Sequence, residues 1–245
     1  MKRHALAAAL STAAVVAGAA PAAPAQAAPF GTTPVSPSKT ACGKAGFTDT
    51  VRCGAALTET FLRSRKAQGV VRETVIAPPA PSGLAWPSGP GVGSPFCGYA
   101  DLPPILALGA HHCDRTTFIL PRTDKERLFT DDVAATAVLI HESGHGMQEA
   151  RGVDVVIPSL TGDSGRQKPM ELSSDCWSGV GIRYLIGTGD LPAAAHGEAS
   201  ALFADIGSPA DTLHGTGPER KAAFEKGYAD GPAACNVIAG VRAFR

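Results

Sequence analysis

The feature that most constrains this chain is an H-E-x-x-H motif. His141, Glu142 and His145 form it within residues 138–148, which read V-L-I-H-E-S-G-H-G-M-Q. Histidines four residues apart lie on one face of an α-helix, so two imidazole nitrogens can bind one Zn²⁺, and the glutamate can accept a proton from a metal-bound water. Because zinc lowers the pKa of that water from about 16 to near 7, the motif predicts a zinc-binding helix and a hydrolytic reaction, most often on a peptide bond.

The surrounding residues favour a buried helix. Residues 130–132 supply an N-cap and acidic first-turn residues, and the apolar run 133–140 follows. Residues at every third or fourth position form one apolar stripe that includes both histidines: Ala134, Ala137, Val138, His141, His145 and Gln148. Gly144 and Gly146 each lower helix propensity by about 1 kcal/mol relative to alanine, which predicts that a third ligand or a substrate backbone approaches closely. The alternative is a surface helix that carries the same pentapeptide by chance.

Two acidic residues further along the chain are candidates for the missing ligand. Residues 170–187 are predicted to form a helix, with Pro169 in its first turn. Glu171 and Asp175 are four residues apart and share a face, so one carboxylate can bind zinc while the other accepts a hydrogen bond from a zinc-bound histidine. Alternatively, both are solvated acids at a helix start, which the helix dipole favours.

These motifs resemble those of a known family, the neutral zinc metallopeptidases. The similarity lies in H-E-S-G-H-G-M-Q, in M-E-L-S-S-D-C, in H-G-T-G-P-E-R-K-A-A-F-E-K-G-Y and in the late Cys235, and it covers roughly residues 97–236. The chain departs from the family pattern at Gly146, where the family usually has histidine, and at residues 173–174, where Ser-Ser replaces Gln-Ala. Neither departure removes a ligand position.

The resemblance implies a role for each residue of the motifs. It implies three zinc ligands, namely His141, His145 and Glu171. It also implies that Glu142 is the general base and that Asp175 supports a zinc-bound histidine, as in gluzincins such as the prenyl-protein proteases. The expected fold class is therefore α+β and mainly helical, a zincin-like metallopeptidase with a small sheet and an active-site helix.

Peptide hydrolysis also requires a group that stabilises the developing oxyanion. His214 is the leading candidate because it lies in a glycine-containing loop just before a predicted helix. Thr216 and Glu219 have the spacing of a capping box, which marks the start of that helix. Arg220 and Tyr228 are weaker candidates, and His214 could instead serve only its own loop.

The N-terminus has the three parts of a secretory signal peptide. A basic start at residues 1–4 precedes the apolar run 5–20 and a small-residue cleavage site before Ala28. We therefore expect residues 1–27 to be removed, residues 28–40 to be a disordered linker, and residues 41–245 to form a single metallopeptidase-like domain. The predicted location is extracellular, with no membrane span in the mature chain because no further apolar run reaches about 20 residues.

Cysteine usage agrees with export. The six cysteines all lie after the predicted cleavage site, and they permit 15 pairings. The family resemblance implies Cys97 with Cys113 and Cys176 with Cys235. Elimination and proximity then leave Cys42 with Cys53. A cysteine-ligated zinc is excluded because no C-x-x-C pair exists.

Outside the zinc motifs the sequence predicts a few further elements. Residues 48–66 are expected to form a helix whose inward side chains include Val51, Ala55, Phe61 and Leu62, and residues 70–76 and 116–120 to form strands. The strand 116–120 is a candidate edge for an extended substrate, and residues 78–95 are expected to form a loop. His111, His112 and His196 are expected at the surface.

The predicted function is a secreted zinc-dependent endopeptidase that acts on a protein or peptide, and a monomer is favoured. Without residues 1–27 the chain has 20 basic residues against 22 acidic ones, which argues against nucleic acid or an anionic membrane as the main partner. One alternative is a secreted, catalytically inactive protein of the same fold that binds zinc or an envelope component. Another is a non-peptide hydrolase such as an amidase, which would use the same site geometry.

Overall fold

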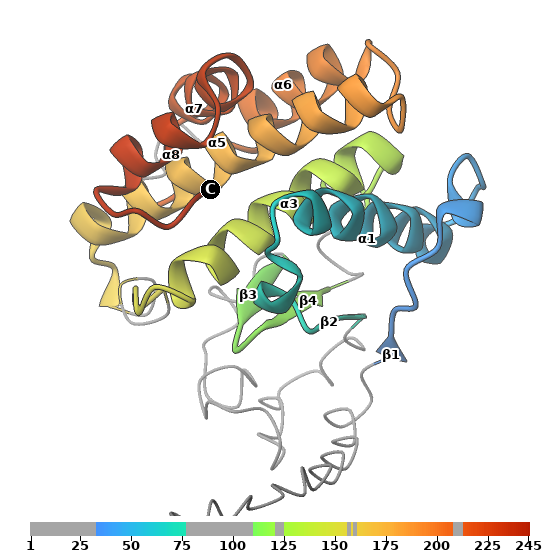
Figure 1. Ribbon diagram of the computed structural model, residues 1–245, viewed down its shortest axis with the longest axis horizontal. Coiled ribbons are helices and arrows are strands. Elements are labelled where there is room, and N and C mark those ends of the chain that lie inside the picture. The colour runs from blue at the N-terminus through green and yellow to red at the C-terminus, as the bar shows by residue number, and fades with distance from the viewer. Residues whose placement is uncertain (1–32, 77–109, 121–124, 156–157, 159–160, 208–212) are drawn as a thin grey trace, which may run out of the picture.

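In the computed structural model, two helices lie on a small sheet and further helices cover them (Figure 1). The structure describes residues 33–76, 110–120, 125–155, 158, 161–207 and 213–245. The described α-helices are α1 (Phe47–Ser64), α3 (Asp132–Glu149), α5 (Ser164–Thr188), α6 (Ala195–Ile206), α7 (Gly217–Asp230) and α8 (Pro232–Ala239). The 3-10 helices are η1 (Lys39–Ala41) and η2 (Gln68–Val70), and the strands are β1 (Thr33–Pro34), β2 (Glu73–Ile76), β3 (His111–Cys113) and β4 (Thr116–Ile119). The predicted class, α+β and mainly helical, is confirmed. The predicted signal peptide 1–27 and loop 78–95 lie outside the described residues.

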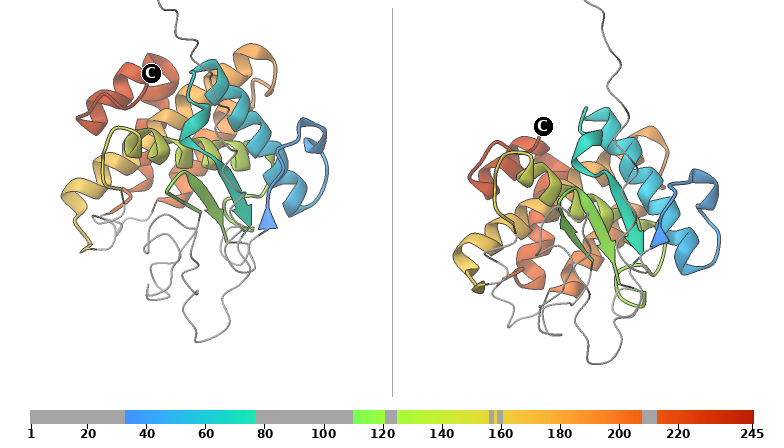
Figure 2. Two further views of the ribbon diagram at one scale, coloured as in Figure 1. Left: turned by 60° about the horizontal axis from the view of Figure 1, so that its bottom comes forward. Right: turned by 90° about the horizontal axis from the view of Figure 1, so that it is seen from below.

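The strands form one mixed sheet in the order β1-β2-β4-β3, seen side by side in Figure 2. β2 and β4 are parallel, and the other pairs are antiparallel. Asp114 and Arg115 make the tight turn from β3 to β4 with positive φ angles of 46° and 61°. β4 is therefore an interior strand, and the prediction that residues 116–120 form an edge is wrong, because β3, which was not predicted, occupies that edge.

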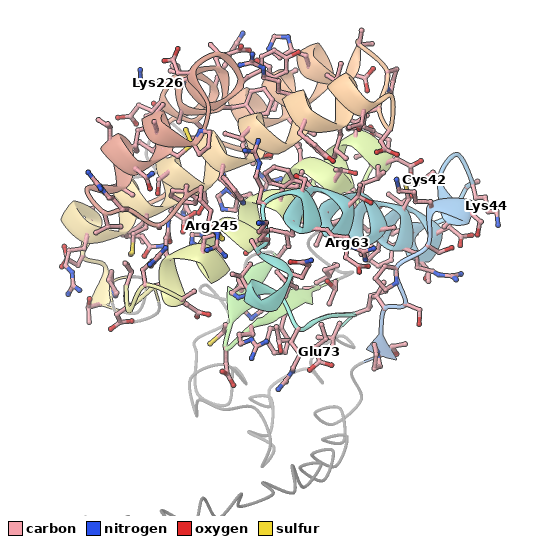
Figure 3. All side chains as sticks on the ribbon, in the orientation of Figure 1. Cys42, Lys44, Arg63, Glu73, Lys226 and Arg245 are labelled. Atoms are coloured by element: carbon pink, nitrogen blue, oxygen red, sulfur yellow. A yellow bond between two sulfur atoms is a disulfide. The ribbon has the colours of Figure 1, made fainter. Side chains whose placement is uncertain are left out.

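The layers follow from which faces are apolar. α1 and α3 pack on the sheet through a cluster that includes Val51 of α1, Val138 of α3 and Ile119 of β4. α5 lies along the other side of α3, and α6, α7 and α8 cover α5 (Figure 1). In Figure 3, Glu73 on β2 and Lys226 on α7 mark the two outer layers of the molecule. α3 and α5 are consequently interior helices, which explains why their side chains are buried on nearly every face.

Trp177 of α5 is the largest side chain at the centre of the core. It is fully buried, and its ring lies 4.8 Å from the ring of Phe61 in α1 and 5.3 Å from that of Phe244 near the C-terminus. Its indole N–H donates a hydrogen bond to Ser143 Oγ of α3 at 3.2 Å, which satisfies the one polar group of the ring. Trp177 thereby joins α1, α3, α5 and the C-terminal segment.

Small residues allow the interior helices to approach closely. A Cβ at Gly227 of α7 would lie 1.8 Å from the carbonyl oxygen of Cys176 in α5. A Cβ at Gly179 of α5 would lie 2.1 Å from the carbonyl oxygen of Phe224 in α7. Each glycine therefore faces the backbone of the opposite helix. Any side chain larger than hydrogen at these positions would force α5 and α7 apart.

The predicted boundaries hold for α1 to within two residues, and α3 starts at its predicted cap, but α5 starts earlier than expected. α5 begins at Ser164 instead of residue 170, so Pro169 lies inside the helix. Asp163 makes the earlier start possible because its side chain accepts a hydrogen bond from Arg166 N at 3.2 Å. Pro169 then removes one helical hydrogen bond without ending the helix. In the predicted strand 70–76, the first residue belongs to η2, and the strand starts at Glu73.

The prediction that residues 28–40 are disordered is wrong for residues 33–40. Thr33 and Pro34 pair with Ile76 and Val75 of β2, and Ser38 N donates to Arg52 O of α1 at 3.0 Å. The Cys42–Cys53 disulfide holds the next residues on α1, and Figure 3 shows Cys42 on the loop beside that helix. Backbone pairing and this covalent link therefore compensate for the polar composition of the segment.

The surface assignment of the outlying histidines also needs correction. The side chain of His112 is buried, with Nδ1 3.1 Å from Thr117 Oγ1 and Nε2 3.4 Å from Glu149 Oε2 at the end of α3. His196 is half-buried and bonds to Glu225 of α7 at 2.8 Å. Each ring therefore has a polar partner on another element of the fold, Glu149 for His112 and Glu225 for His196.

Two of the predicted disulfides are present, Cys42–Cys53 and Cys176–Cys235. Cys113 is also disulfide-bonded, and Cys97, its expected partner, lies outside the described residues. None of the described helices is both long enough and apolar enough to cross a bilayer.

The α5–α7 contact leads to a stability prediction. We expect Gly227→Ala to destabilise the protein by about 1–3 kcal/mol or more, because the new methyl group meets the Cys176 carbonyl. Gly187→Ala in α5 is the matched control, since a Cβ there meets nothing within 4 Å and should stabilise the helix by up to about 1 kcal/mol. Urea unfolding of both variants measures the difference, and equal stabilities would show that the two helices can separate without cost.

Candidate metal centre

The two histidines of the motif lie side by side on α3, buried between α3 and α5. His141 is 5% exposed and His145 is 7% exposed. Their Nε2 atoms are 3.2 Å apart, as the spacing of four residues in a helix allows. Asp131 caps the start of α3 by accepting a hydrogen bond from Ala134 N at 2.8 Å, which confirms the predicted start of the helix. The burial of both histidines confirms their predicted inward direction.

Glu171 of α5 completes a group of three donor atoms. Its Oε2 lies 3.3 Å from His141 Nε2, and its Oε1 lies 3.6 Å from His145 Nε2. Ligand atoms of a tetrahedral zinc, at Zn–N and Zn–O distances of about 2.0–2.1 Å, are about 3.3 Å apart. The structure therefore brings His141, His145 and Glu171 together as a buried group that could bind a metal ion, with separations that suit a small divalent cation.

The close approach of α3 and α5 depends on Gly144. A Cβ at this position would lie 2.7 Å from Ser174 Oγ and 3.0 Å from Ser174 Cα. Gly146 faces the other way, since a Cβ there would lie 2.7 Å from the carbonyl oxygen of Val70 and 3.0 Å from the His112 ring. The close approach expected at these glycines is therefore made by α5 at Gly144 and by η2 and β3 at Gly146.

Asp175 orients the first histidine. Its Oδ1 lies 2.7 Å from His141 Nδ1, so Nδ1–H donates to the carboxylate and Nε2 faces Glu171. Arg220 of α7 donates two hydrogen bonds to the same carboxylate, from Nε to Oδ2 at 2.9 Å and from Nη2 to Oδ1 at 2.8 Å. Because both side chains are buried, Asp175 carries its negative charge in a fully paired state.

Gln148 orients the second histidine. Its Oε1 lies 3.1 Å from His145 Nδ1 and accepts a hydrogen bond from that ring, which directs Nε2 toward Glu171. Its Nε2 donates to Met170 O and to Ser173 Oγ, both at 2.9 Å. One amide side chain thus links the metal-facing helix to the helix that carries the third donor.

The charges of the cluster favour a bound cation. Burial lowers the pKa of His141, but the hydrogen bonds that His141 donates to Asp175 and Glu171 and the charges of Asp175 and Glu142 raise it to about 10. Burial acts in the same direction on His145, whose pKa is nevertheless raised, chiefly by Glu171. Burial raises the pKa of Glu171, but the charges of His145 and His214 hold it well below its usual range. The buried carboxylates therefore favour positive charge on the two histidines. A divalent cation can supply that charge in place of the protons.

Glu142 stands beside the three donors without joining them. It is 4% exposed, and its Oε2 has no hydrogen-bond partner within the part of the chain that the structure describes. An unpaired carboxylate oxygen in a buried polar site costs free energy unless another group uses it. This position suits a base that receives a proton from a water held at the cluster.

His214 is half-buried in the loop before α7 and lies close enough to Glu171 for its charge to lower the pKa of that carboxyl. The predicted capping box is present, since Thr216 N donates to Glu219 Oε2 at 2.8 Å and Glu219 N donates back to Thr216 Oγ1 at 3.4 Å. Lys168 of α5 ties this loop to α5 through an ion pair of 2.8 Å with Glu219. The loop therefore brings His214 toward the metal-binding group.

The weaker oxyanion candidates have other roles. Arg220 is bound to Asp175, and the ring of Tyr228 stacks on His196 with centroids 4.0 Å apart. Sequence reasoning did not assign the pairing of Arg220 with Asp175, and it also missed Gln167, which donates to Glu171. The spacing of Gln167 and Glu171 would have revealed the second contact if the helix had been predicted to begin before Pro169.

No protein-family model matches this chain, and the searches of curated proteins and of solved structures returned no match. The chemistry of the site therefore rests on its own donor atoms and their surroundings.

The buried Arg220–Asp175 pair predicts a large loss of stability when one partner is removed. We expect Arg220→Met to destabilise the metal-free protein by about 3–5 kcal/mol, because Asp175 would remain buried without its cation. Replacing Asp175 with Asn in the same variant should recover part of that loss. The control is Arg183→Met, whose exposed side chain bonds to carbonyl groups of α7 and should cost about 1 kcal/mol or less. Equal losses for the two single variants in urea unfolding would contradict the pairing.

Proposed function

We propose that this chain is a secreted zinc-dependent endopeptidase. The observation that carries the proposal is the buried group of His141, His145 and Glu171, whose donor atoms are spaced as around a tetrahedral ion. Beside it lies Glu142, whose Oε2 has no hydrogen-bond partner among the described residues. Two imidazoles and one carboxylate form a typical donor set of catalytic zinc. Bound zinc would supply a Lewis acid that polarises the substrate carbonyl and lowers the pKa of a water.

The side chains of the site can perform the remaining proton transfers. Glu142 accepts a proton from the water as the water oxygen attacks the carbonyl carbon of the scissile bond. Glu142 then returns the proton to the amide nitrogen as the C–N bond breaks, which leaves a free acid and a free amine. His214 donates a hydrogen bond to the carbonyl oxygen while negative charge develops there.

The number of protein donors favours catalysis over a purely structural ion. Structural zinc sites use four protein ligands, whereas catalytic sites use three and leave a position for water. Among the His, Cys, Asp and Glu side chains of the described residues, the buried group contains three donors. The catalytically inactive binding protein of the same fold remains the second candidate, and the general-base variant below separates the two.

The proposed extracellular location rests on the signal-peptide pattern of residues 1–27 and on the disulfides. Cys42–Cys53 and Cys176–Cys235 are compatible with an oxidising compartment. The Cys176–Cys235 bridge joins α5 directly after Asp175 to α8. Reduction would therefore remove a covalent support of the helix that carries the third donor.

Glu142→Gln tests the proposed general base. We expect this variant to keep one zinc per chain, since the three donors are unchanged, and to hydrolyse an unfolded protein substrate at a rate lower by a factor on the order of 10² or more. Glu198→Gln on the exposed side of α6 makes the same chemical change away from the site and should retain the wild-type rate. A wild-type protein that binds zinc but shows no hydrolysis beyond that of Glu142→Gln would favour the binding-protein alternative.

His214→Ala tests the proposed oxyanion role. The expected result is an unchanged zinc content and a kcat lower by a factor on the order of 10²–10³, the loss found when one oxyanion donor is removed. His196→Ala is the matched control, because that ring lies between α6 and α7 and bonds to Glu225. If kcat falls equally in both variants, a general effect on folding explains the loss and His214 has no special role.

A further inference from the structure

Gln167 occupies a special position next to the proposed metal ligands. It lies one turn before Glu171 on α5, and only 3% of its surface is exposed. Its side-chain Nε2 donates a hydrogen bond to Glu171 Oε1 at 2.5 Å. Gln167 therefore contacts one of the three proposed ligands through its amide N–H.

The orientation of the Gln167 amide is set by charge. A carboxylate can only accept hydrogen bonds, so the amide nitrogen must face Glu171 and the amide oxygen must point away. That oxygen, Oε1, is buried and has no hydrogen-bond partner within the described residues. An unsatisfied buried acceptor costs about 1–3 kcal/mol, a loss that an apolar side chain of the same size would avoid.

The two carboxylate oxygens of Glu171 consequently differ. Oε1 accepts the hydrogen bond from Gln167 and lies 3.6 Å from His145 Nε2. Oε2 is the oxygen nearer to an imidazole, at 3.3 Å from His141 Nε2. Because Gln167 already uses one lone pair of Oε1 and Oε2 lies nearer to an imidazole, Oε2 is the oxygen better placed to bind a cation.

We propose that Gln167 is a positioning residue that makes Glu171 bind the metal through Oε2 alone. The proposal rests on the zinc site of the proposed function and deepens it. A carboxylate that bound through both oxygens would take a further coordination position, the one that hydrolysis needs for water or substrate. Gln167 keeps that position open at the cost of its own unsatisfied oxygen.

A purely structural role predicts a different outcome. A Gln–Glu pair four residues apart on a helix can stabilise the helix by about 0.2–0.5 kcal/mol. Removing such a pair would change the stability of the metal-free protein and leave the bound metal unaffected. The proposed role instead predicts a change at the metal with little loss of stability.

The experiment compares wild type, Gln167→Met, Gln167→Asn and Arg166→Met. Methionine keeps the volume but cannot donate, asparagine keeps the amide but is one methylene too short, and Arg166 is an exposed neighbour on α5 that serves as the control. Zinc affinity is measured by competition with a chelator. The visible absorption of the Co²⁺-substituted proteins reports the coordination number, and urea unfolding of the metal-free proteins reports stability.

We expect both Gln167 variants to bind zinc about 10–100-fold more weakly, as is usual when a hydrogen bond to a ligand is lost. We also expect weaker visible Co²⁺ bands, because the ion gains a ligand when Glu171 binds through both oxygens. Gln167→Met should stay within about 1 kcal/mol of the wild-type stability without metal, because loss of the hydrogen bond to Glu171 offsets removal of the unsatisfied amide oxygen. Wild-type affinity and spectrum in both Gln167 variants would overturn this inference while the zinc site stands, and a wild-type protein that binds neither ion would overturn the zinc site and this inference together.

Discussion

The metal-binding group depends on the close contact between α3 and α5. The imidazoles come from α3 and the third donor from α5, so the distance between two helices sets the size of the site. Gly144 permits this distance because even a methyl group there would meet Ser174, and Gln148 spans the same contact with hydrogen bonds to Met170 O and Ser173 Oγ. Ser173 and Ser174 therefore lie in the helix contact itself, where small polar side chains both fit and accept hydrogen bonds.

The electrostatics of the site follow from how its carboxylates are paired. Arg220 neutralises Asp175 through two hydrogen bonds, so Asp175 can hold His141 without adding net charge to the core. The remaining two carboxylates, Glu142 and Glu171, are buried beside the imidazoles. The pKa of His141 is raised chiefly by Asp175, with Glu171 and Glu142 adding to it, and the pKa of His145 is raised chiefly by Glu171. A buried group with this excess of acceptors is stabilised by a divalent cation far better than by solvent, which it hardly contacts.

Local patterns in the sequence predicted the parts of the fold and site that depend on neighbours in the chain. The cap at Asp131, the inward histidines and the capping box at Thr216 all follow from spacings of two to four residues, and the structure contains each of them. Contacts between distant segments were beyond such reasoning: Arg220 reaches Asp175 across 45 residues, and the fit of Gly227 against Cys176 depends on the crossing of two helices. β3 was missed because three residues show no alternation. The start of α5 was misplaced because Pro169 resembles a first-turn residue, although Asp163 already caps the helix.

The helix α5 is held from both sides, and this arrangement couples the proposed metal site to the C-terminal half of the chain. On one side α3 supplies the imidazoles. On the other side a single segment supplies His214 and Arg220, and its start is tied to α5 by the ion pair between Lys168 and Glu219. The glycine contacts with α7 and the Cys176–Cys235 bridge to α8 fix α5 to the C-terminal helices. A substrate carbonyl at the proposed site would thus meet groups whose positions are set by packed helices and not by loops alone, which is the rigidity that electrostatic stabilisation of a developing charge requires.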